Sequence, residues 1–504
     1  MPIPIVNSIA SWFLKKRFHQ IELFLKYPVE VQEELLHNLL IKAKNTEIGK
    51  EFDFSSITTY REFADRVPIT TYEDNEPRIE RARRGEANIF WPKPIKWFAK
   101  SSGTTNAKSK FIPVSQESLE DCHYAASKDL LCMYFNNNPD SQLFVGKGLR
   151  LGGSKELYRE NGTVFGDLSA ILIDNMPFWA EFSSTPSNEV SLMSDWETKM
   201  QAIVDETINE NVTSLAGVPS WMLVLLNSVM ESTKAKNLFE VWPNLEVYFH
   251  GGVSFDPYVE QYKKLLPGDN FKYYEIYNAS EGFFAIQDQN HSNELLLMLD
   301  YGIFYEFIPM STFGTPKQKV IPLSEVVAGE NYAIVITTNA GLWRYMVGDT
   351  VRFTSTNPFR IKVTGRTKHH INVFGEELII ENAEAALRKV TKLTHTEIVD
   401  YTVAPIFMEG KEKGAHEWII EFKHPPEDFA NFSKLLDQSL QEVNSDYEAK
   451  RYNNTTLNAP KIHCGRERLF YDWLKQNDKL GGQHKVPRLS NSREYLEELL
   501  SLNS

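Results

Sequence analysis

Apolar residues recur at steps of three and four positions over residues 18–45 (FHQIELFLKYPVEVQEELLHNLLIKAKN), a spacing that places them on one face of a helix. Pro28 lies inside this stretch and is expected to break it into two helices. A further helix is predicted over 113–136, where Pro113 and a candidate cap at Ser115 precede the run YAASKDLLCMYF. The first part of the chain is therefore expected to be rich in helices.

Short runs rich in β-branched and aromatic residues follow, and these predict strands. The predicted strands are LEVYFH (245–250), KYYEIY (272–277), IFYEFI (303–308), YAIVITT (332–338) and DTVRFT (349–354). LLLMLDYGIFYEFI is expected to form a hairpin that turns near Asp300–Gly302. Helical stretches at 195–210 and 219–233 lie between some of the strands. The mixture predicts α/β or α+β layering with both parallel and antiparallel strands.

The character of the sequence changes after Arg366. Residues 376–392 resemble a helix, VDYTVAPIF and EWIIEFKH resemble strands, and FANFSKLLDQSLQEV resembles another helix. We therefore expect a large N-terminal domain of mixed sheets and helices over residues 1–366 and a small α+β domain over residues 367–504.

Composition and charge exclude several classes of protein. The 504 residues carry a net charge of −13, which argues against non-specific nucleic-acid binding because that requires a basic field. Cys122, Cys132 and Cys464 are too few for a disulfide framework and match no zinc spacing, so reduced thiols are expected. No apolar run reaches the length of a membrane span, and the start MPIPIVNSIASWFLKKR lacks the features of a signal peptide. These features predict a cytoplasmic protein without stable membrane insertion.

The stretch SSGTTNAKSKFIP (101–113) combines a glycine, several hydroxyl side chains and two lysines. Gly103 permits a positive φ and a close approach of the backbone to a ligand. A nest of backbone amides with a nearby lysine binds phosphate well, although the spacing is not that of the common P-loop. A phosphate cradle and an ordinary polar loop are both compatible with these residues.

Two carboxylates follow β-type runs at positions where a ligand could reach them. Glu281 in YNASEG (277–282) could hold Mg²⁺, which usually takes only one or two protein carboxylates, or it could be a solvated turn residue. Asp349 in GLWRYMVGDTVRF (341–353) could accept hydrogen bonds from ribose hydroxyls, or it could simply cap its turn.

Three further motifs leave similar alternatives open. Arg366 in TGRTKHH could contact phosphate or ribose, or it could be a linker residue. Lys485 in GGQHKVPR lies on a glycine-rich loop and could be either a functional or an ordinary surface lysine. HGG (250–252) is expected to be a tight turn after a strand, and its glycines would also allow a flat ligand to lie close.

The order of these motifs is more specific than any one of them. SSGTT with its lysine, HGG, YNASE, YMVGD, GR and QHKVPR, in that order, resemble the adenylate-forming superfamily of acyl-CoA synthetases, peptide-synthetase adenylation domains and luciferases. The closer resemblance is to the auxin-responsive Gretchen Hagen family of acyl-acid–amido synthetases, and it extends from about residue 40 to residue 490. Met346 stands where the plant members carry an arginine, and HHINVFGEELIIENAE is closer to the general superfamily, so a divergent, bacterial-type member is indicated.

The resemblance implies the adenylate-forming fold with a mobile C-terminal domain, an ATP site and a magnesium ion. It implies that the phosphates are held by Ser101, Ser102, Gly103, Thr104 and Thr105, with Lys110 as the loop lysine. It places Gly251 and Gly252 near the adenine, Tyr277 and Ser280 along the nucleotide, Glu281 on Mg²⁺, Asp349 on the ribose, Arg366 at the hinge, and Lys485 as a catalytic lysine arriving from the small domain.

The implied reaction is attack of a carboxylate on the α-phosphorus of ATP, followed by transfer of the acyl group from acyl-AMP to an amine. The partners would be a small carboxylic acid and an acceptor. The acceptor would be an amine or, in the first alternative, the thiol of coenzyme A. A non-catalytic nucleotide-binding relic is the second alternative. Glu281, Asp349 and Lys485 occurring together argue against the relic, since it has no need of all three.

The acyl pocket is expected to draw on the helix 118–135 and on apolar segments near the other motifs. Aromatic residues at such positions also serve as core residues, so both roles stay open. The candidate pocket residues are Tyr124, Trp221, Met222, Phe283 and Phe284.

Overall fold

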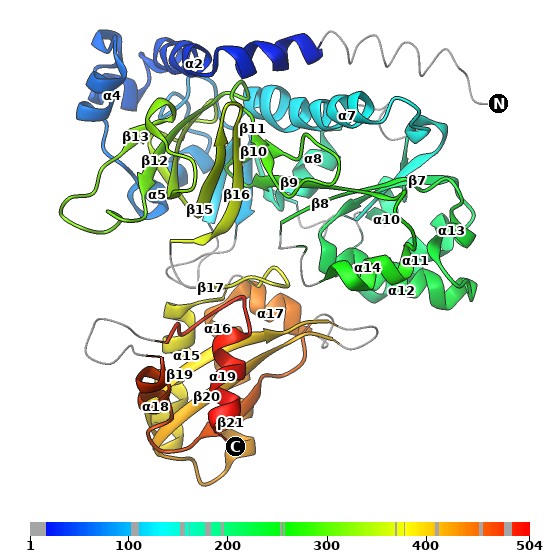
Figure 1. Ribbon diagram of the computed structural model, residues 1–504. Helices are drawn as coiled ribbons and strands as arrows, with labels where there is room; N and C mark the ends of the chain where they lie inside the picture. Colours follow the sequence, from blue (N-terminus) through cyan, green and yellow to red (C-terminus); the bar gives the residue numbers. More distant parts are fainter. Residues whose placement is uncertain are drawn as a thin grey trace.

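The computed structural model consists of a large N-terminal part and a smaller C-terminal part (Figure 1). No described helix combines the length and the apolarity that are needed to cross a membrane. The described residues are 17–101, 110–151, 157–160, 162–176, 183–191, 193, 196–252, 255, 258–367, 370–376, 378–408, 413–452, 457–477 and 486–503.

The N-terminal helices pack on the main sheet. Pro28 begins α2, which confirms the predicted break. Proline suits this position because the first turn of a helix does not use the N–H that proline lacks. The side-chain amide of Gln32 on α2 donates to the carbonyls of Leu299 and Ile303 at 2.8 and 3.0 Å, which fixes the helix against the sheet. The helices of this region are residues 17–26, α2 (Pro28–Ala43), α3 (Glu47–Glu51), α4 (Tyr60–Arg66) and α5 (Tyr72–Arg83).

Within the described residues, twelve strands form one continuous sheet. β9, β8, β7, β3 and β6 run parallel to one another, and the remaining neighbours are antiparallel, which confirms the predicted mixture. In order across the sheet, the strands are β13 (Ile321–Pro322), β12 (Ile303–Pro309), β14 (Asn331–Thr338), β15 (Tyr345–Thr356), β16 (Phe359–Arg366), β11 (Leu295–Leu297), β10 (Gly282–Ile286), β9 (Lys272–Ala279), β8 (Val247–Gly251), β7 (Val212–Gly217), β3 (Lys147–Arg150) and β6 (Ser184–Thr185).

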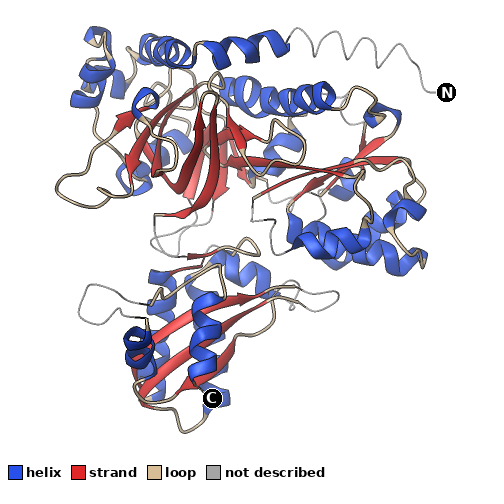
Figure 2. Cartoon of the chain, in the orientation of Figure 1, coloured by secondary structure: helices blue, strands red, loops and turns tan. Residues whose placement is uncertain are grey.

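Helices cover both faces of the parallel half of this sheet (Figures 1 and 2). On β8, the ring of Phe249 meets Tyr134 of α7 at 5.7 Å between centroids, whereas Tyr248 stacks on Tyr262 of α14 at 5.2 Å on the opposite face. Because both faces are covered, the carboxyl ends of the parallel strands are where a ligand is expected. The helices are α7 (Ala125–Asn137), α11 (Trp196–Thr207), α12 (Pro219–Thr233) and α14 (Val259–Leu265).

The antiparallel half is strongly coiled. β16, β11 and β10 separate β15 from β9, and four steps of about 4.8 Å would place these strands roughly 19 Å apart in a flat sheet. The hydroxyl of Tyr277 on β9 nevertheless donates to the carboxylate of Asp349 on β15 at 2.8 Å. Irregular registers in the β9–β10, β14–β15 and β15–β16 pairs increase the local twist that this contact requires.

A separate four-stranded sheet carries the two ends of the predicted phosphate loop. Ser101 on β1 pairs with Lys110 on β2, and residues 102–109 between them lie outside the described residues. The predicted cap is confirmed, because the hydroxyl of Ser115 accepts a hydrogen bond from the backbone N–H of Ser118 at 2.9 Å. The strands, in order, are β2 (Lys110–Val114), β1 (Trp97–Ser101), β5 (Thr163–Gly166) and β4 (Tyr158–Glu160), and β2 leads into the short helix α6 (Gln116–Ser118).

The hairpin predicted for LLLMLDYGIFYEFI is wrong. β11 pairs with β10 and β16, whereas β12 pairs with β13 and β14. The turn itself occurs at Gly302, whose φ is 72° and where a Cβ would lie 2.2 Å from the side-chain nitrogen of Asn339. The side chain of Tyr301, the residue before Gly302, points to helix α7 (Ala125–Asn137), where its hydroxyl donates to Asp129 at 2.8 Å. The segment therefore crosses between distant strands instead of joining neighbours.

The C-terminal part is a three-stranded sheet with helices on both faces (Figure 2). Trp418 and Ile420 on β20 pack with α15 and α16, and Ile419 between them packs with α18 and α19. This confirms a smaller C-terminal sheet domain, while the boundary at Arg366 stays a prediction. The elements are β17 (His370–Ile371), β18 (Leu378–Ile379), α15 (Ile380–Thr394), β19 (Glu397–Ile406), β20 (Ala415–His424), α16 (Phe429–Val443), α17 (Ser445–Arg451), β21 (Lys461–Gly465), α18 (Leu469–Gln476) and α19 (Glu494–Leu502).

The two parts of the molecule touch below the parallel half of the main sheet (Figure 1). Contacts between described residues that join them include two hydrogen bonds and one cation–π contact, together with apolar packing. These contacts are Tyr258 Oη to Val373 O at 3.3 Å, Gln261 Nε2 to Met408 O at 2.6 Å, and Lys450 Nζ over the ring of Trp221 at 4.2 Å.

Replacing Arg344 by methionine should lower the free energy of unfolding by about 3–5 kcal/mol, because Glu306 would remain as a buried charge without its cation. The two side chains are 5% and 0% exposed and meet at 2.8 Å. Urea unfolding measures the loss. Arg352→Met, at an exposed position of β15, the strand that follows Arg344, should change the free energy of unfolding by less than about 0.5 kcal/mol. Equal effects of the two substitutions would contradict this role of the ion pair.

Candidate active site

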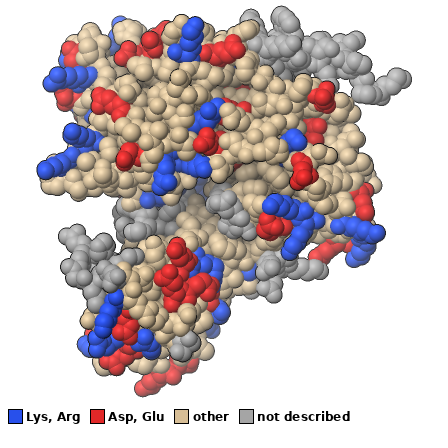
Figure 3. Space-filling model, viewed as in Figure 1, with Lys and Arg blue, Asp and Glu red and all other residues tan. Residues whose placement is uncertain are grey.

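A cleft of about 1790 Å³ opens where the carboxyl ends of β8 and β9 meet β15, β16 and the C-terminal part. The surface is hollowed between the two parts at this level (Figure 3). The volume exceeds the roughly 300–1,000 Å³ of an ordinary small-ligand pocket, so a nucleotide and a second substrate both have room. Residues predicted from the sequence that line the cleft are Lys110, Gly252, Tyr277, Ser280, Glu281, Asp349 and Arg366.

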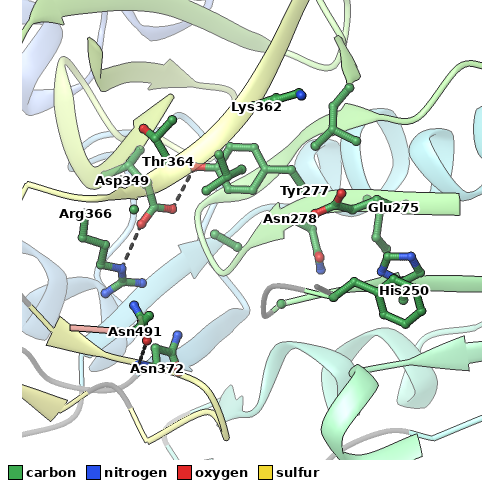
Figure 4. Close-up of a pocket in the computed structure, with 18 of the residues that line it drawn as sticks. His250, Glu275, Tyr277, Asn278, Asp349, Lys362, Thr364, Arg366, Asn372 and Asn491 are labelled. Atoms are coloured by element: carbon green, nitrogen blue, oxygen red, sulfur yellow. Dashed lines mark hydrogen bonds and ion pairs between the residues drawn. The ribbon is translucent and has the colours of Figure 1, made fainter. Parts of the chain in front are cut away.

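Asp349 is the centre of the polar network in this cleft (Figure 4). Its Oδ2 accepts a hydrogen bond from Tyr277 at 2.8 Å, and its Oδ1 pairs with Nε of Arg366 at 2.9 Å. Burial, followed by the charge of Asp349, raises the pKa of Tyr277 well above its usual value, so the phenol stays a donor. Each carboxylate oxygen has a second lone pair, so Asp349 can also accept hydrogen bonds from two vicinal hydroxyls.

Glu281 follows β9 and is partly buried in the same cleft. Burial raises the pKa of its carboxyl to about 7; the charge of Asp349 acts in the same direction, while Lys110 and Arg366 oppose it. A cation beside Glu281 would favour the ionised form. No group of three or more His, Cys, Asp and Glu side chains within the described ranges could hold a metal alone. A single carboxylate nevertheless fits Mg²⁺, which takes its remaining ligands from phosphates and water.

Lys110 supplies positive charge at the start of β2. Its ammonium lies 5.5 Å from the ring centroid of Tyr72, and it lines the cleft near enough to Glu281 to act on that carboxyl. Ser101, its partner in the ladder, ends β1. Ser102, Gly103, Thr104 and Thr105 lie outside the described residues, so their phosphate role stays a prediction.

The two predicted adenine glycines have different surroundings. A Cβ at Gly251 would lie 2.5 Å from the carbonyl oxygen of Ile276, so this glycine is required by the close approach of β8 to β9. Gly252 has a φ of 84° and lines the cleft. A contact between adenine and these glycines stays a prediction, and Gly252 is the one placed to make it.

Three of the predicted acyl-pocket residues are core residues. Met222, Phe283 and Phe284 are at most 6% exposed and belong to the two main hydrophobic clusters. Trp221 is partly buried beneath the ammonium group of Lys450 from the C-terminal part. These surroundings favour packing and domain contact, and the acyl role of the four residues stays a prediction.

Tyr124 has surroundings that fit an acyl pocket better. It ends a six-residue π-helical segment, η2 (Leu119–Tyr124), and such segments are frequent at functional sites. Its hydroxyl donates to the carbonyl of Leu172 at 2.9 Å, and burial, with the charge of Asp174, raises its pKa to about 12. The side chain is partly buried against the core, but Tyr124 is not among the described residues that line the cleft, so its acyl role stays a prediction.

Lys485 lies outside the described residues, but the chain that follows it is well anchored. Val486 is 3% exposed, and the carbonyl of Pro487 accepts a hydrogen bond from the hydroxyl of Thr402 at 2.5 Å. Further on, the backbone N–H of Asn372 donates to the side chain of Asn491 at 2.9 Å (Figure 4). The segment after Lys485 therefore reaches the cleft, which Asn491 lines.

Some lining residues were missed by the sequence reasoning. His250 lies one residue before the end of β8 and lines the cleft, although only the two glycines after it were considered. A histidine near the end of a buried strand, directly before two glycines, was the available signal. Asn491, Ser492 and Arg493 also line the cleft, and no motif in the sequence indicated them.

Comparisons with known proteins cover almost the whole chain. Models of the GH3 family N-terminal, central and C-terminal domains match residues 17–271, 296–366 and 381–494. Indole-3-acetic acid-amido synthetase GH3.2 of Arabidopsis thaliana is 23% identical, with 92% of this chain and 98% of that protein aligned. Jasmonoyl–L-amino acid synthetase JAR6 of Nicotiana attenuata is also 23% identical, with 99% and 98% aligned.

Solved structures show the same fold. The GH3.15 acyl acid amido synthetase has a TM-score of 0.59 at 18% identity, covering 94% of this chain and 93% of that one. A 2-hydroxyisobutyryl-CoA ligase in complex with 2-HIB-AMP and CoA has a TM-score of 0.59 at 14% identity, covering 94% and 92%. The fold is therefore that of the adenylate-forming ligases.

The N-terminal family model alone matches just over half of the chain, and the other two match most of the rest. The chain belongs to the GH3 family. The acyl acid–amido synthetase predicted from the order of the motifs is confirmed, and membership in an adenylate-forming family implies the use of ATP.

Replacing Glu281 by glutamine should stabilise the protein more at pH 8 than at pH 5. The folded state raises the pKa of this carboxyl from 4.5 to about 7, so its stabilising contribution is present below about pH 4.5 and is lost as the pH rises through about 7. The glutamine variant should gain up to about 3 kcal/mol relative to the native chain at pH 8.

Urea unfolding at both pH values, without magnesium, tests this expectation. Glu330→Gln, at an exposed position, should show no such difference between the two pH values. If the effect of Glu281→Gln did not depend on pH, the folded state would not raise the pKa of this carboxyl.

Proposed function

We propose that the cleft holds ATP and a carboxylic acid together, and that the chain couples the acid to the amine of an amino acid through an acyl-adenylate. The amido synthetase class follows from the family, and the relatives are named for indole-3-acetic acid and jasmonate. The observation that supports this assignment of the site is the network of Asp349, Tyr277 and Arg366 beside Glu281.

The nucleotide would lie across the carboxyl ends of β8 and β9. Asp349 would accept hydrogen bonds from the ribose hydroxyls, with Arg366 holding the carboxylate in place and offering charge to the phosphates. Tyr277 and Ser280 would flank the nucleotide, since both line the cleft. The phosphates would lie toward Lys110 and the loop that joins β1 to β2, which supplies Ser101, Ser102, Gly103, Thr104 and Thr105.

Glu281 would hold a magnesium ion. The single carboxylate that it offers, in the cleft proposed to hold the phosphates, would suit a metal that takes its other ligands from phosphate oxygens and water. A bound magnesium ion would neutralise charge on the leaving pyrophosphate. Glu281 itself would be ionised in that state, because a cation opposes the effect of burial on its pKa.

Two bond exchanges complete the reaction. In the first, a carboxylate oxygen of the acid forms a bond to the α-phosphorus of ATP, and the bond from that phosphorus to the bridging oxygen breaks, releasing pyrophosphate. In the second, the amine nitrogen attacks the acyl carbon, the bond to the AMP oxygen breaks, and the amine loses one proton. Positive side chains are needed in the first step because both reactants are anionic.

The small domain would be residues 367–504, moving as a lid. The backbone N–H of Thr367 donates to the carbonyl of Gly348 at 2.8 Å, and Arg366 is paired with Asp349, so the proposed hinge begins directly at the ribose site. Lys485 would enter the cleft from this domain to bridge the carboxylate and the α-phosphate. Withdrawing it would admit the acceptor, and closure would shield the adenylate from water.

Acid-dependent exchange of labelled pyrophosphate into ATP tests the first half-reaction. The native chain should exchange with at least one acid in a panel of indolic, jasmonate-like, aromatic and fatty acids. Asp349→Ala should reduce the rate by on the order of 10²–10³. Asp288→Ala breaks a comparable ion pair, that with Arg360 at 2.6 Å, and should keep most of the rate.

Lys485→Ala should reduce exchange by a similar factor, on the order of 10²–10³, if the lysine bridges the reacting groups. Lys475→Ala, at an exposed position on α18, serves as its control and should leave the rate unchanged. Retention of full exchange by Lys485→Ala would remove this lysine from the mechanism.

The acceptor is tested by product analysis. With ATP and a competent acid present, amino acids should give an amide and AMP, detected by mass spectrometry. Coenzyme A should give no thioester under the same conditions, because the two relatives named above are amido synthetases. A thioester without an amide would favour the ligase alternative, and bound ATP without exchange for any acid would favour a non-catalytic relic.

A further inference from the structure

His250 is a buried polar residue of the cleft whose position calls for a partner. It is the second-last residue of β8, is 2% exposed and lines the cleft. Its Nδ1 is shielded from solvent and has no hydrogen-bond partner within the described part of the chain. Buried polar atoms nearly always have a partner, so an unpartnered nitrogen on a cleft wall indicates that a ligand atom completes it.

The ring is held firmly in place. It stacks on Phe255 with centroids 4.2 Å apart and planes 27° apart, and Tyr248 lies 5.2 Å away on the same strand. In the ladder, His250 pairs with Gly217 on β7, which has no side chain, and with Glu275 on β9. The ring and Glu275 lie on neighbouring strands, and both line the cleft (Figure 4).

The chemistry around this ring suits a flat, uncharged group. Burial lowers the pKa of His250 to about 3, so the imidazole is neutral at physiological pH and offers one donor and one acceptor nitrogen. Phe255 and Tyr273 add aromatic surface to the same wall. The cations Lys110 and Arg366 act instead on Glu281, which is where phosphates are expected.

We infer that His250 binds the adenine base of ATP through a hydrogen bond to Nδ1, and so selects the base. The inference rests on the proposed function, because it takes the phosphate and ribose ends of the nucleotide to lie at Lys110 and Asp349. With those ends fixed, the base is the remaining part of the nucleotide, and it is a planar, neutral ring with a polar edge. The wall formed by His250 and Phe255 matches that description.

The test compares nucleotides as well as variants. Equilibrium binding by calorimetry is measured for ATP and for analogues that each lack one polar group of the base: purine riboside triphosphate without the amine, 1-deaza-ATP and 7-deaza-ATP. In the native chain, at least one analogue should bind about tenfold more weakly than ATP, which is the effect of one neutral hydrogen bond.

His250→Phe keeps a ring against Phe255 but removes both nitrogens. It should bind ATP about tenfold more weakly. It should also lose the native preference for ATP over the analogue that was discriminated, which shows that the two groups are coupled. His250→Asn, which restores a polar atom near the position of Nδ1, should recover part of that preference. The KM for the acid should stay within about twofold of the native value in each variant, since the base is distant from the carboxylate.

Three results would overturn the inference. The native chain could bind all the analogues as tightly as ATP, which tests the idea even if a variant fails to fold. His250→Phe could keep the native preference unchanged. The substitution could instead raise the KM for the acid alone, which would place His250 in the acyl pocket. Pyrophosphate exchange by the native chain is measured in parallel. The absence of exchange would count against the proposed function as a whole. Exchange by a protein whose preference for ATP does not depend on His250 would count against the role of His250 only.

Discussion

The hydrogen bond from Tyr277 to Asp349 is the constraint on which the site depends. It joins two strands that three others separate, so it can form only because the antiparallel half of the sheet is coiled. The same carboxylate holds Arg366 on the adjacent strand. One buried aspartate, itself the candidate ribose acceptor, therefore sets the positions of a tyrosine of the cleft and of the arginine at the proposed hinge. The irregular registers on both sides of Asp349 are part of this arrangement rather than defects of the sheet.

Two ion pairs within a short stretch of the chain have different roles, because one is enclosed by the protein and the other lines the cleft. Arg344 directs its guanidinium into the interior, where it contacts Glu306 and the carbonyls of Ala64 and Val67. All of these partners belong to the protein, so the pair has a structural role. Asp349, five positions later, is only slightly more exposed, but its carboxylate lines the cleft and keeps lone pairs for a ligand. Presence in a motif does not distinguish these two roles; the direction of each side chain does.

The sequence predicted the elements and the motif cluster better than it predicted the long-range pairing. The strands around Tyr248, Tyr274 and Ile334 carry strong local patterns. The first two strands are parallel, so the motifs after them meet at one edge of the sheet. The motif after Ile334, which contains Asp349, lies in the antiparallel half and reaches the cleft because that half is coiled. The hairpin failed because hydrophobic alternation does not specify which neighbour a strand chooses, and contacts distant in sequence decided it. The core positions of Phe283 and Phe284 likewise depend on β10 being covered on both faces, which the local sequence does not show. His250 was overlooked because a buried histidine is ordinary until the structure shows that Nδ1 lacks a partner.

The contacts between the two parts are consistent with a lid that moves about the proposed hinge. The hydrogen bonds of Tyr258 and Gln261 end on backbone carbonyls of the C-terminal part, and the third contact is a lysine over the face of Trp221. Water can replace the hydrogen bonds when the surfaces separate, and a cation–π contact at such a site contributes only about 0.5–2 kcal/mol. Arg366, in contrast, is held by the buried carboxylate of Asp349 on the large part. Rotation is therefore expected to begin after Arg366, which leaves the ion pair of Arg366 with Asp349 intact while the small domain changes its orientation.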